Sequence, residues 1–366
     1  MSGVIGRNAF SVCLLFVQVG SVTLAQDSTT YRVTFDSIWS AATHPVDWPG
    51  GVAHYSGLIG GTHNATATFW ELGGIATSGI EAMAEFGSKV GLENEVKAAI
   101  AAGTAGSVIS GGGLGTTPGS VSVEFTATQE FPLASIVSMI APSPDWFVGT
   151  NGLDLRSGDG WAGKIVHELD PYDAGTDSGL TFRSLNADTQ PAEVIHSLSD
   201  VFPFQNTGPL GTFTFLRLID GDFNETGTLD AADIDALGAA IRNGLSDARF
   251  DLNNDDAVTA ADRNVLVNEL LNTYAGDSNL DGEFNSSDLT KIFQASQYED
   301  GISGNSSWET GDWNGDEEFE TSDLVYAFAE GGYERGRRAA VGVPEPSSFV
   351  TALLAMLLLL VRARRS

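Results

Sequence analysis

The sequence is short of thiols and of positive charge. Cys13 is its one cysteine, and 18 lysines and arginines stand against 48 aspartates and glutamates, which gives a formal net charge of −30 at pH 7. The missing thiols exclude a disulfide framework. The acidic balance excludes nucleic acid as an expected partner and favours divalent cations instead.

The N-terminus predicts export. Arg7 precedes an apolar stretch from Ala9 to Val19, and the segment Thr23-Leu24-Ala25 stands before the polar Gln26. This order is typical of a secretory signal peptide, here residues 1–25, with cleavage after Ala25. Cys13 lies inside that peptide, so the exported chain would carry no thiol. Some other form of bracing, with bound metal as the obvious one, would have to replace disulfides.

The C-terminus carries a second address. Its apolar run, Phe349 to Val361, would span roughly 20 Å as a helix, which is short of the roughly 30 Å hydrocarbon core of a bilayer. Val343-Pro344-Glu345-Pro346 precedes the run, and three of the last five residues are arginine. This order resembles the PEP-CTERM sorting signal. The resemblance implies an exosortase-type processing enzyme and a membrane anchor within residues 335–366, the alternative being a plain tail anchor held by its arginines.

Four segments in the last third share the pattern of a calcium loop. Each has Asp at position 1, Asn at 3, an apolar residue at 8 and Asp at 12. A hard cation such as Ca²⁺ takes six to eight oxygen ligands, which alternating side chains and the backbone carbonyl at position 7 can supply. The predicted calcium-binding residues are Asp222, Asn224, Thr226, Thr228, Asp230 and Asp233; Asp251, Asn253, Asp255, Ala257 and Asp262; Asp277, Asn279, Asp281, Glu283 and Asp288; and Asp312, Asn314, Asp316, Glu318 and Asp323.

The four loops depart from the standard pattern in three ways. Thr226 weakens the ligand at position 5 of the first loop. Asp256 and Glu317 replace the glycine that position 6 usually needs for its sharp bend, which predicts weaker or distorted second and fourth loops. Position 12 is Asp in every loop, where an EF-hand has a bidentate Glu.

An amphipathic helix is predicted after each loop, with no helix before it. A loop followed by an exit helix resembles the dockerin type I repeat. The resemblance implies two small α-helical, EF-hand-like modules, residues 221–273 and 276–334, and a cohesin-like partner bound through loop positions 10 and 11. Those positions hold Ala231 and Ala232, Ala260 and Ala261, Ser286 and Ser287, and Thr321 and Ser322. The alternative is that the repeats are calcium-stiffened spacers.

Residues 29–219 read as an all-β antiparallel sandwich with short helices. Val121, Val123 and Phe125 alternate with polar residues, Phe131 to Ile140 is a nearly continuous apolar strand, and Thr212 to Ile219 forms another. Helical stretches are expected at Ile80–Phe86 and Leu92–Ile100. Many short strands separated by Gly- and Pro-rich turns favour a sandwich, and the stretch from Gly111 to Gly119 predicts a flexible surface loop.

Two turns of this domain carry candidate ligands. One turn holds Asp145, and the other holds Asp173 and Asp177 on either side of a glycine. If both turns lie at one end of the sandwich, the three carboxylates could converge on a cation; alternatively, they cap turns by accepting from backbone N–H groups. His44, His54 and His63 could suggest a transition-metal site. They lack the helical i, i+4 pairing of a zinc protease and no cysteine accompanies them, so ordinary turn or core roles are expected for them.

The same domain resembles the spondin N-terminal domain of the F-spondin and mindin type. The resemblance runs through His54-Tyr55-Ser56, Thr62-His63-Asn64 and the Pro142-Ser143-Pro144-Asp145-Trp146 turn to the second turn, Asp173 to Gly179. It implies a C2-like β-sandwich that binds a divalent metal at the loops of one end. Asp145 and Asp173 are then the leading ligands and Asp177 a weaker one. The animal members contain cysteines in this domain, and this chain has none.

These features together predict a secreted, non-catalytic, calcium-binding adhesion or extracellular-matrix protein at the cell surface. The sandwich would be the binding head, and the repeats would be a stalk or docking unit; expected partners are surface proteins and envelope or extracellular polysaccharide. The alternative is a dockerin-recruited component of an extracellular polysaccharide-degrading assembly. A hydrolase has least support, because no Gly-x-Ser-x-Gly nucleophile elbow occurs in the sequence.

Overall fold

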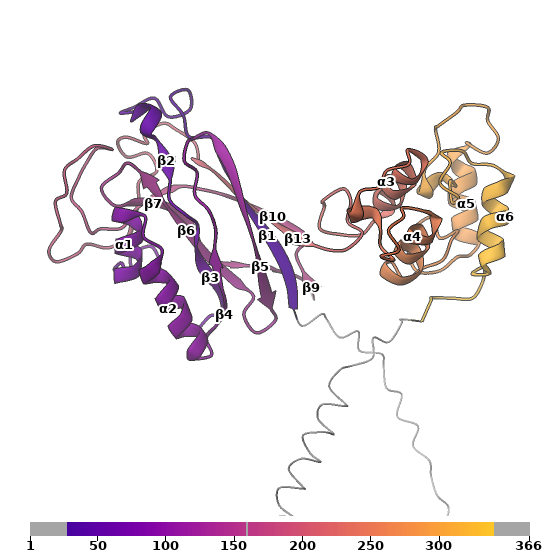
Figure 1. The fold of residues 1–366 in the computed structure, drawn as a ribbon, viewed down its shortest axis with the longest axis horizontal. Helices are drawn as coiled ribbons and strands as arrows, with labels where there is room; N and C mark the ends of the chain where they lie inside the picture. The colour runs from indigo at the N-terminus through magenta and orange to yellow at the C-terminus, as the bar shows by residue number, and fades with distance from the viewer. Residues whose placement is uncertain (1–27, 159, 340–366) are drawn as a thin grey trace, which may run out of the picture.

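The computed structural model describes residues 28–158 and 160–339. The predicted signal peptide (1–25) and the sorting signal that begins at Pro344 lie outside the described residues. Within the described part, no helix combines the length and the apolarity that crossing a bilayer requires. The chain forms a β-rich domain followed by a helical unit (Figure 1).

The β-rich domain consists of two antiparallel sheets. The smaller sheet has the order β10 (Lys164–Glu168), β13 (Gly211–Leu218), β1 (Ser28–Ser37) and β5 (Gly119–Thr128). The larger has the order β12 (His196–Ser197), β11 (Pro171–Asp173), β7 (Trp146–Asp154), β6 (Leu133–Ala141), β3 (Ile59–His63) and β4 (Ala105–Ser110), and β2 (His54–Tyr55) pairs with β6. β8 (Arg156–Ser157) and β9 (Gly160–Trp161) form a separate hairpin. The predicted antiparallel sandwich with short helices is confirmed.

Strands of the two sheets differ in their pattern of apolar residues, because different elements cover the outer face of each sheet. β6 is mostly apolar because both of its faces are buried: Ile136 and Ile140 join the core between the sheets, while Val137 and Met139 pack under the helices. The helices α1 (Ser78–Phe86) and α2 (Val90–Ala101) lie over the outer face of the larger sheet (Figure 1). β5 alternates because no helix covers the outer face of its sheet. Both predicted helical stretches are confirmed.

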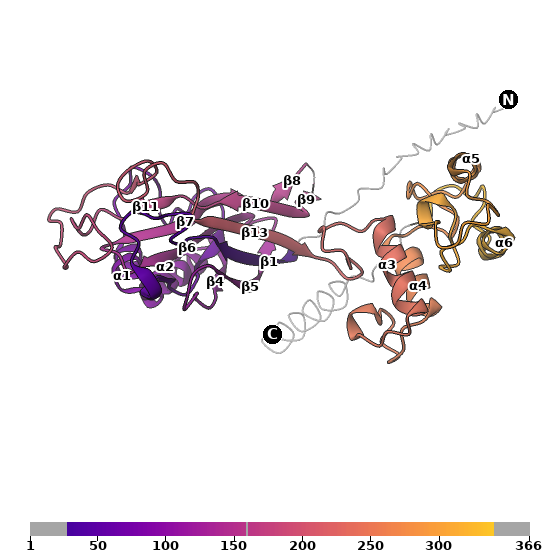
Figure 2. The same ribbon diagram turned by 90° about the horizontal axis from the view of Figure 1, so that it is seen from above.

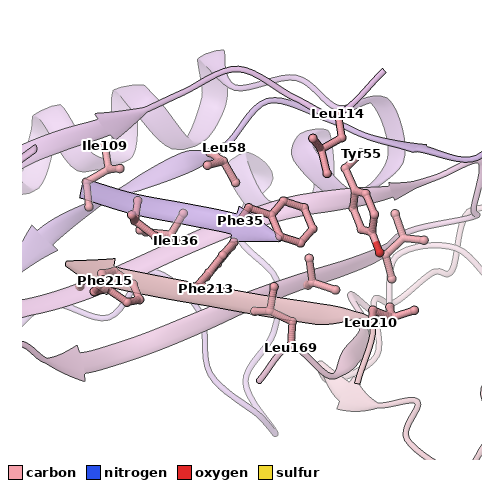
Figure 3. Close-up of a cluster of buried hydrophobic side chains, with 14 of the residues drawn as sticks. Phe35, Tyr55, Leu58, Ile109, Leu114, Ile136, Leu169, Leu210, Phe213 and Phe215 are labelled. Atoms are coloured by element: carbon pink, nitrogen blue, oxygen red, sulfur yellow. The ribbon is translucent and has the colours of Figure 1, made fainter. Parts of the chain in front are cut away.

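Aromatic rings fill the space between the sheets. Phe35 meets Tyr55 and Phe213 edge-on, with ring centroids 4.7 and 5.3 Å apart, and Figure 3 shows these rings beside Leu114. Leu114 comes from the glycine-rich stretch and is only 6% exposed. The prediction of a flexible surface loop there is therefore incomplete: a loop forms, but it closes over the core. Large buried rings of this kind contribute strongly to stability without any metal.

The last third forms four loop–helix repeats. The helices are α3 (Ala231–Arg242), α4 (Ala260–Val265) continued by the π-helical η3 (Leu266–Leu270), α5 (Ser286–Ala295) and α6 (Thr321–Glu330). Short 3₁₀ turns, η2 (Ala248–Phe250) and η4 (Trp308–Thr310), precede the second and fourth loops; a third, η1 (Gly50–Val52), lies in the sandwich. Residues from both predicted modules share one apolar core, which includes Leu237, Leu266, Phe284 and Trp313.

The strand directions place the two regions' candidate sites far apart. The β6–β7 turn lies at the end of the sandwich where β13 begins: Tyr55 pairs with Ile140 just before that turn and bridges to Leu114, and β5 starts soon afterwards at Gly119, whose partner Ser37 also pairs with Gly211. β13 then carries the chain to the opposite end, where the repeats follow (Figure 2).

Candidate metal centres

Asp145 is fully buried in the β6–β7 turn, against the turn that follows β11. Strand pairing sets Asp173 opposite Trp146, and Ala174 N donates to Asp145 O at 3.2 Å. Asp145 Oδ2 accepts from Thr176 N at 2.7 Å and from Asp177 N at 3.0 Å. Asp145 Oδ1 is also buried and has no hydrogen-bond partner within residues 28–158 and 160–339. A buried carboxylate oxygen without a partner is costly unless a cation satisfies it.

The second carboxylate of this site belongs to Asp173, which is 8% exposed. Its Oδ1 accepts from Gly175 N at 2.8 Å, and its Oδ2 accepts from Trp146 Nε1 at 3.1 Å. Burial and, second to it, the neighbouring Asp173 carboxylate raise the pKa of Asp145 to about 6; burial also raises the pKa of Asp173. Two buried, neighbouring carboxylates form a donor set that fits a divalent cation.

Asp177 is placed differently from the other two aspartates. Its Oδ1 accepts from Gly179 N at 2.7 Å, and its Oδ2 accepts from Ala187 N at 2.8 Å. Both oxygens therefore cap the turn, as the alternative interpretation predicted for all three residues. His196, which the sequence did not single out, lies with Nδ1 4.0 Å from Asp173 Oδ1. The pairing of β11 with β12 brings His196 to this position. The sequence around His196 does not indicate that contact.

The histidines of the first strands are engaged separately. His44 Nε2 lies 3.0 Å from Gly208 O, and His63 Nε2 lies 2.8 Å from Ser135 Oγ. His54 is exposed, with Nδ1 2.8 Å from Val52 O. These contacts agree with ordinary turn and core roles.

All four predicted calcium loops have the same backbone conformation. Positions 4 and 6 have positive φ in every loop, at Glu225 and Gly227, Asn254 and Asp256, Leu280 and Gly282, and Gly315 and Glu317. Asp256 and Glu317 reach φ values of 65° and 70°, so the sharp bend is kept without glycine. The cost is the strain of a left-handed side-chain-bearing residue, of order 1–2 kcal/mol. In each loop the position 1 carboxylate accepts from the N–H groups of positions 5 and 6.

Position 12 has a structural role that the sequence analysis missed. Its aspartates, which are Asp233, Asp262, Asp288 and Asp323, are 0% exposed. Each carboxylate accepts from the backbone N–H groups of positions 2, 3 and 9. Position 9 is also the N-cap of the exit helix, so positions 9 and 12 form a capping box. In the sequence, the spacing between the N-cap at position 9 and the aspartate at position 12 could have indicated this capping box. The box gives position 12 a role besides metal binding.

The fourth loop brings the most carboxylates together. Oxygens of Asp312, Asp316 and Asp323 lie within 4.8 Å of one another, and no other group of three His, Cys, Asp or Glu side chains in the described part of the chain does so. Burial raises the pKa of Asp323 to about 6 and also raises the pKa of Asp312. Clustered, buried carboxylate oxygens are the ligand type that calcium prefers. The residues of this loop therefore fit Ca²⁺.

The residues predicted to bind a partner lie at the start of each exit helix. Ala231 is half-buried, and the other seven are exposed, namely Ala232, Ala260, Ala261, Ser286, Ser287, Thr321 and Ser322. Thr321 is already engaged, since its Oγ1 donates to Glu299 Oε1 at 2.9 Å and lies 2.8 Å from Tyr298 Oη. Ser287 Oγ donates to Asn285 Oδ1, and Ser322 Oγ donates to Glu320 Oε1, so the hydroxyls of these positions also bond within their own loops. Ala260 and Ala261 form an exposed pair of small side chains without polar groups.

Comparison with known proteins concerns the front region. A family model described as Spondin_N matches residues 29–211. Spondin-1 of Mus musculus is 38% identical over 179 residues, which cover 47% of this chain and 22% of the relative. Spondin-2 of Homo sapiens is 34% identical over 201 residues, which cover 54% of this chain and 60% of the relative. The chain thus spans less than two thirds of the length of either relative, and the family match ends at residue 211, before the four repeats.

Proposed function

Because this chain belongs to the Spondin_N family, we propose that it is an exported, non-catalytic adhesion or matrix protein with a metal-dependent binding head. The single observation that carries the proposal is the buried Asp145 Oδ1, which has no partner among the described residues and lies in a site shared with Asp173. A divalent cation held there would complete that site. The site lies at the end of the sandwich opposite the repeats, so the repeats leave that end uncovered (Figure 2).

The repeats act in this proposal as a calcium-braced stalk or docking unit. Their loops share one backbone conformation, and the carboxylates of the fourth loop converge. Calcium is the proposed cation because each loop offers only oxygen ligands. The N-terminal signal peptide would export the protein, and the C-terminal PEP-CTERM-like segment would hold it at the envelope, transiently or permanently, until an exosortase-type enzyme processes it.

The test of the head is a pull-down of envelope polysaccharide and surface proteins by residues 28–339, with calcium and with chelator. Asp145→Asn removes one charge from the site and should abolish calcium-dependent capture. Asp154→Asn is the matched control, because Asp154 lies at the other end of β7, paired with Arg156 at 2.7 Å. If neither the chelator nor Asp145→Asn changes the capture, the proposal of a metal-dependent head is refuted.

A second candidate function is recruitment to an extracellular polysaccharide-degrading assembly through a cohesin-like partner. The exposed pairs of small residues at loop positions 10 and 11 favour it. Binding of cohesin domains to residues 28–339 tests this function, with Ala261→Arg as the blocking variant. Val90→Arg is its control, because Val90 is 66% exposed but begins α2 of the sandwich, outside the repeats. Cohesin binding that is absent, or equal in the two variants, would count against recruitment.

A further inference from the structure

Arg263 is a buried cation that reaches from the second repeat into the fourth. It directly follows Asp262, the position 12 residue of the second loop, and is only 5% exposed. Its guanidinium donates through Nη1 to Asn314 O, at position 3 of the fourth loop. The same group lies over the Tyr326 ring of α6, 5.5 Å from its centroid. A charge buried this far is kept only where specific acceptors hold it.

Gly315 leaves the space that this guanidinium occupies. A Cβ at Gly315 would lie 2.1 Å from Arg263 Nη1. The left-handed backbone alone does not require glycine there, because Glu225, Asn254 and Leu280 hold the same conformation at position 4 of the other three loops. Glycine at position 4 of the fourth loop is therefore explained by the contact with Arg263.

Arg242 makes a second link between the first and the fourth repeat. It lies at the end of α3, and its Nη1 donates to Gly315 O at 2.5 Å, while Nη2 pairs with Glu317. Glu317 is the residue that replaces glycine at position 6 of the fourth loop. An arginine partner at this position accounts for an acidic side chain where the bend alone would favour glycine.

From these contacts we propose that Arg263 is a clasp that couples cation binding in the second loop to cation binding in the fourth, while Arg242 holds the fourth loop against α3 of the first repeat. The clasp deepens the calcium-binding role proposed for the repeats, and it rests on that role. Asp262 and Arg263 are adjacent, so ordering the second loop also fixes the start of α4 and the guanidinium that holds the Asn314 carbonyl. The four repeats then respond as one unit and not as two independent modules.

The coupling is reciprocal, because each loop must change the affinity of the other by the same factor. Arg263 links the two repeats directly, so we expect about a tenfold effect, within the usual range for linked sites. Arg242 and Arg263 are positioning residues in this scheme: they orient the loop backbone and supply no ligand to the cation.

The test follows the fourth loop with Tb³⁺, a calcium substitute whose emission a nearby tryptophan sensitises. Trp313 occupies position 2 of that loop, so the signal lost in Trp313→Phe reports its occupancy. In residues 28–339, Asp251→Ala disables the second loop and should weaken Tb³⁺ binding at the fourth by about tenfold. In a Gly315→Ala or Arg263→Ala background, Asp251→Ala should have no further effect, and Arg263→Lys should restore part of the coupling.

Two controls separate the clasp from general damage. Gly282→Ala adds the same methyl at a left-handed position of the third loop, where its nearest neighbour is 3.7 Å away, and should leave the coupling intact. Arg337→Ala removes one exposed charge beside the third loop and should do the same. Circular dichroism in calcium checks that each variant folds, and Arg263→Ala carries the test if Gly315→Ala does not.

The possible failures are distinguishable. Trp313-dependent Tb³⁺ binding that is unchanged by Asp251→Ala would overturn the clasp and leave the calcium-binding role standing. Coupling that survives in both Gly315→Ala and Arg263→Ala would also overturn it. Complete absence of Trp313-dependent binding would overturn the calcium-binding role together with the clasp.

Discussion

The head and the repeats bury different kinds of side chain. The head encloses large aromatic rings such as Phe35, Trp146 and Phe213 between two sheets, and its three buried aspartates gather at one end. The repeats share one apolar core but also bury six aspartates, namely Asp233, Asp262, Asp277, Asp288, Asp312 and Asp323. Metal binding in the head would therefore affect only one end of the sandwich. Metal binding in the repeats would affect the stability of the whole unit.

This difference has an energetic consequence. The exit helices contain at most 12 residues, and isolated helices of that length are marginal in water. Their N-termini are organised by position 12 carboxylates, whose burial without a cation is unfavourable. The head would depend on metal at one site only, because most of its stability comes from apolar area removed from water.

The largest expected effect that tests this contrast is metal removal. With calcium at 100 times its Kd, each occupied loop should add about 2.7 kcal/mol to the free energy of unfolding. Calorimetry of residues 28–339 should therefore show a repeat transition that falls steeply in chelator, while the head transition moves by no more than one site's contribution. Equal shifts of the two transitions, or no shift in either, would break the comparison.

The converse perturbation is a core truncation in the head. Phe35→Ala removes a ring that contacts Tyr55 and Phe213, and should lower the head's free energy of unfolding by about 3–5 kcal/mol. Because no predicted metal ligand touches that ring, the loss should be equal with calcium and with chelator. Urea titrations in both conditions measure it. A calcium-dependent loss would show that metal binding braces the head core as well.

A smaller effect is expected from pH in the metal-free protein. Burial raises the pKa of Asp323 to about 6, against about 3.9 in an unfolded chain. A raised carboxyl pKa stabilises the fold below about pH 4, and this contribution is lost as the pH rises through 6. The shift corresponds to about 3 kcal/mol at most.

Calcium should reverse the direction of this pH dependence, because its ligands must be deprotonated. Urea unfolding of the repeats at pH 4.5 and 7, with and without calcium, measures both slopes. Asp323→Asn serves as the control, since its amide does not titrate, and it should flatten the metal-free slope. A metal-free repeat unit that grows more stable between these pH values would contradict the assigned shift.

The sequence predicted the local features of both regions well. Sequence periodicity predicted the alternation along β5, the apolar run of β6 and the helices α1 and α2, with bounds correct to within a few residues. The antiparallel sandwich follows from the same pattern. The contacts that decide the sites span long separations: Asp145 meets Thr176, and Arg263 reaches Asn314. Such pairings depend on which turns lie at the same end of the sandwich and which repeats share a core. The periodicity of the sequence contains no information on either point. Calcium occupancy of the loops stays a prediction.

The smallest expected effect concerns the junction of the two regions. Gly163, between β9 and β10, faces Gly227 of the first loop so closely that a Cβ at Gly163 would lie 2.8 Å from Gly227 O. Arg32 of β1 and Glu225 lie 3.7 Å apart beside this contact. Gly163→Ala should push the first loop off the sandwich and lower the repeat transition in calcium by about 1–3 kcal/mol, as overpacking usually does. Gly160→Ala is the matched control, because a Cβ there meets nothing within 4 Å. Scattering measurements should show a more extended particle for Gly163→Ala but not for Gly160→Ala. Equal scattering profiles and equal melting of the two variants would mean that the contact between head and repeats does not stabilise the repeats.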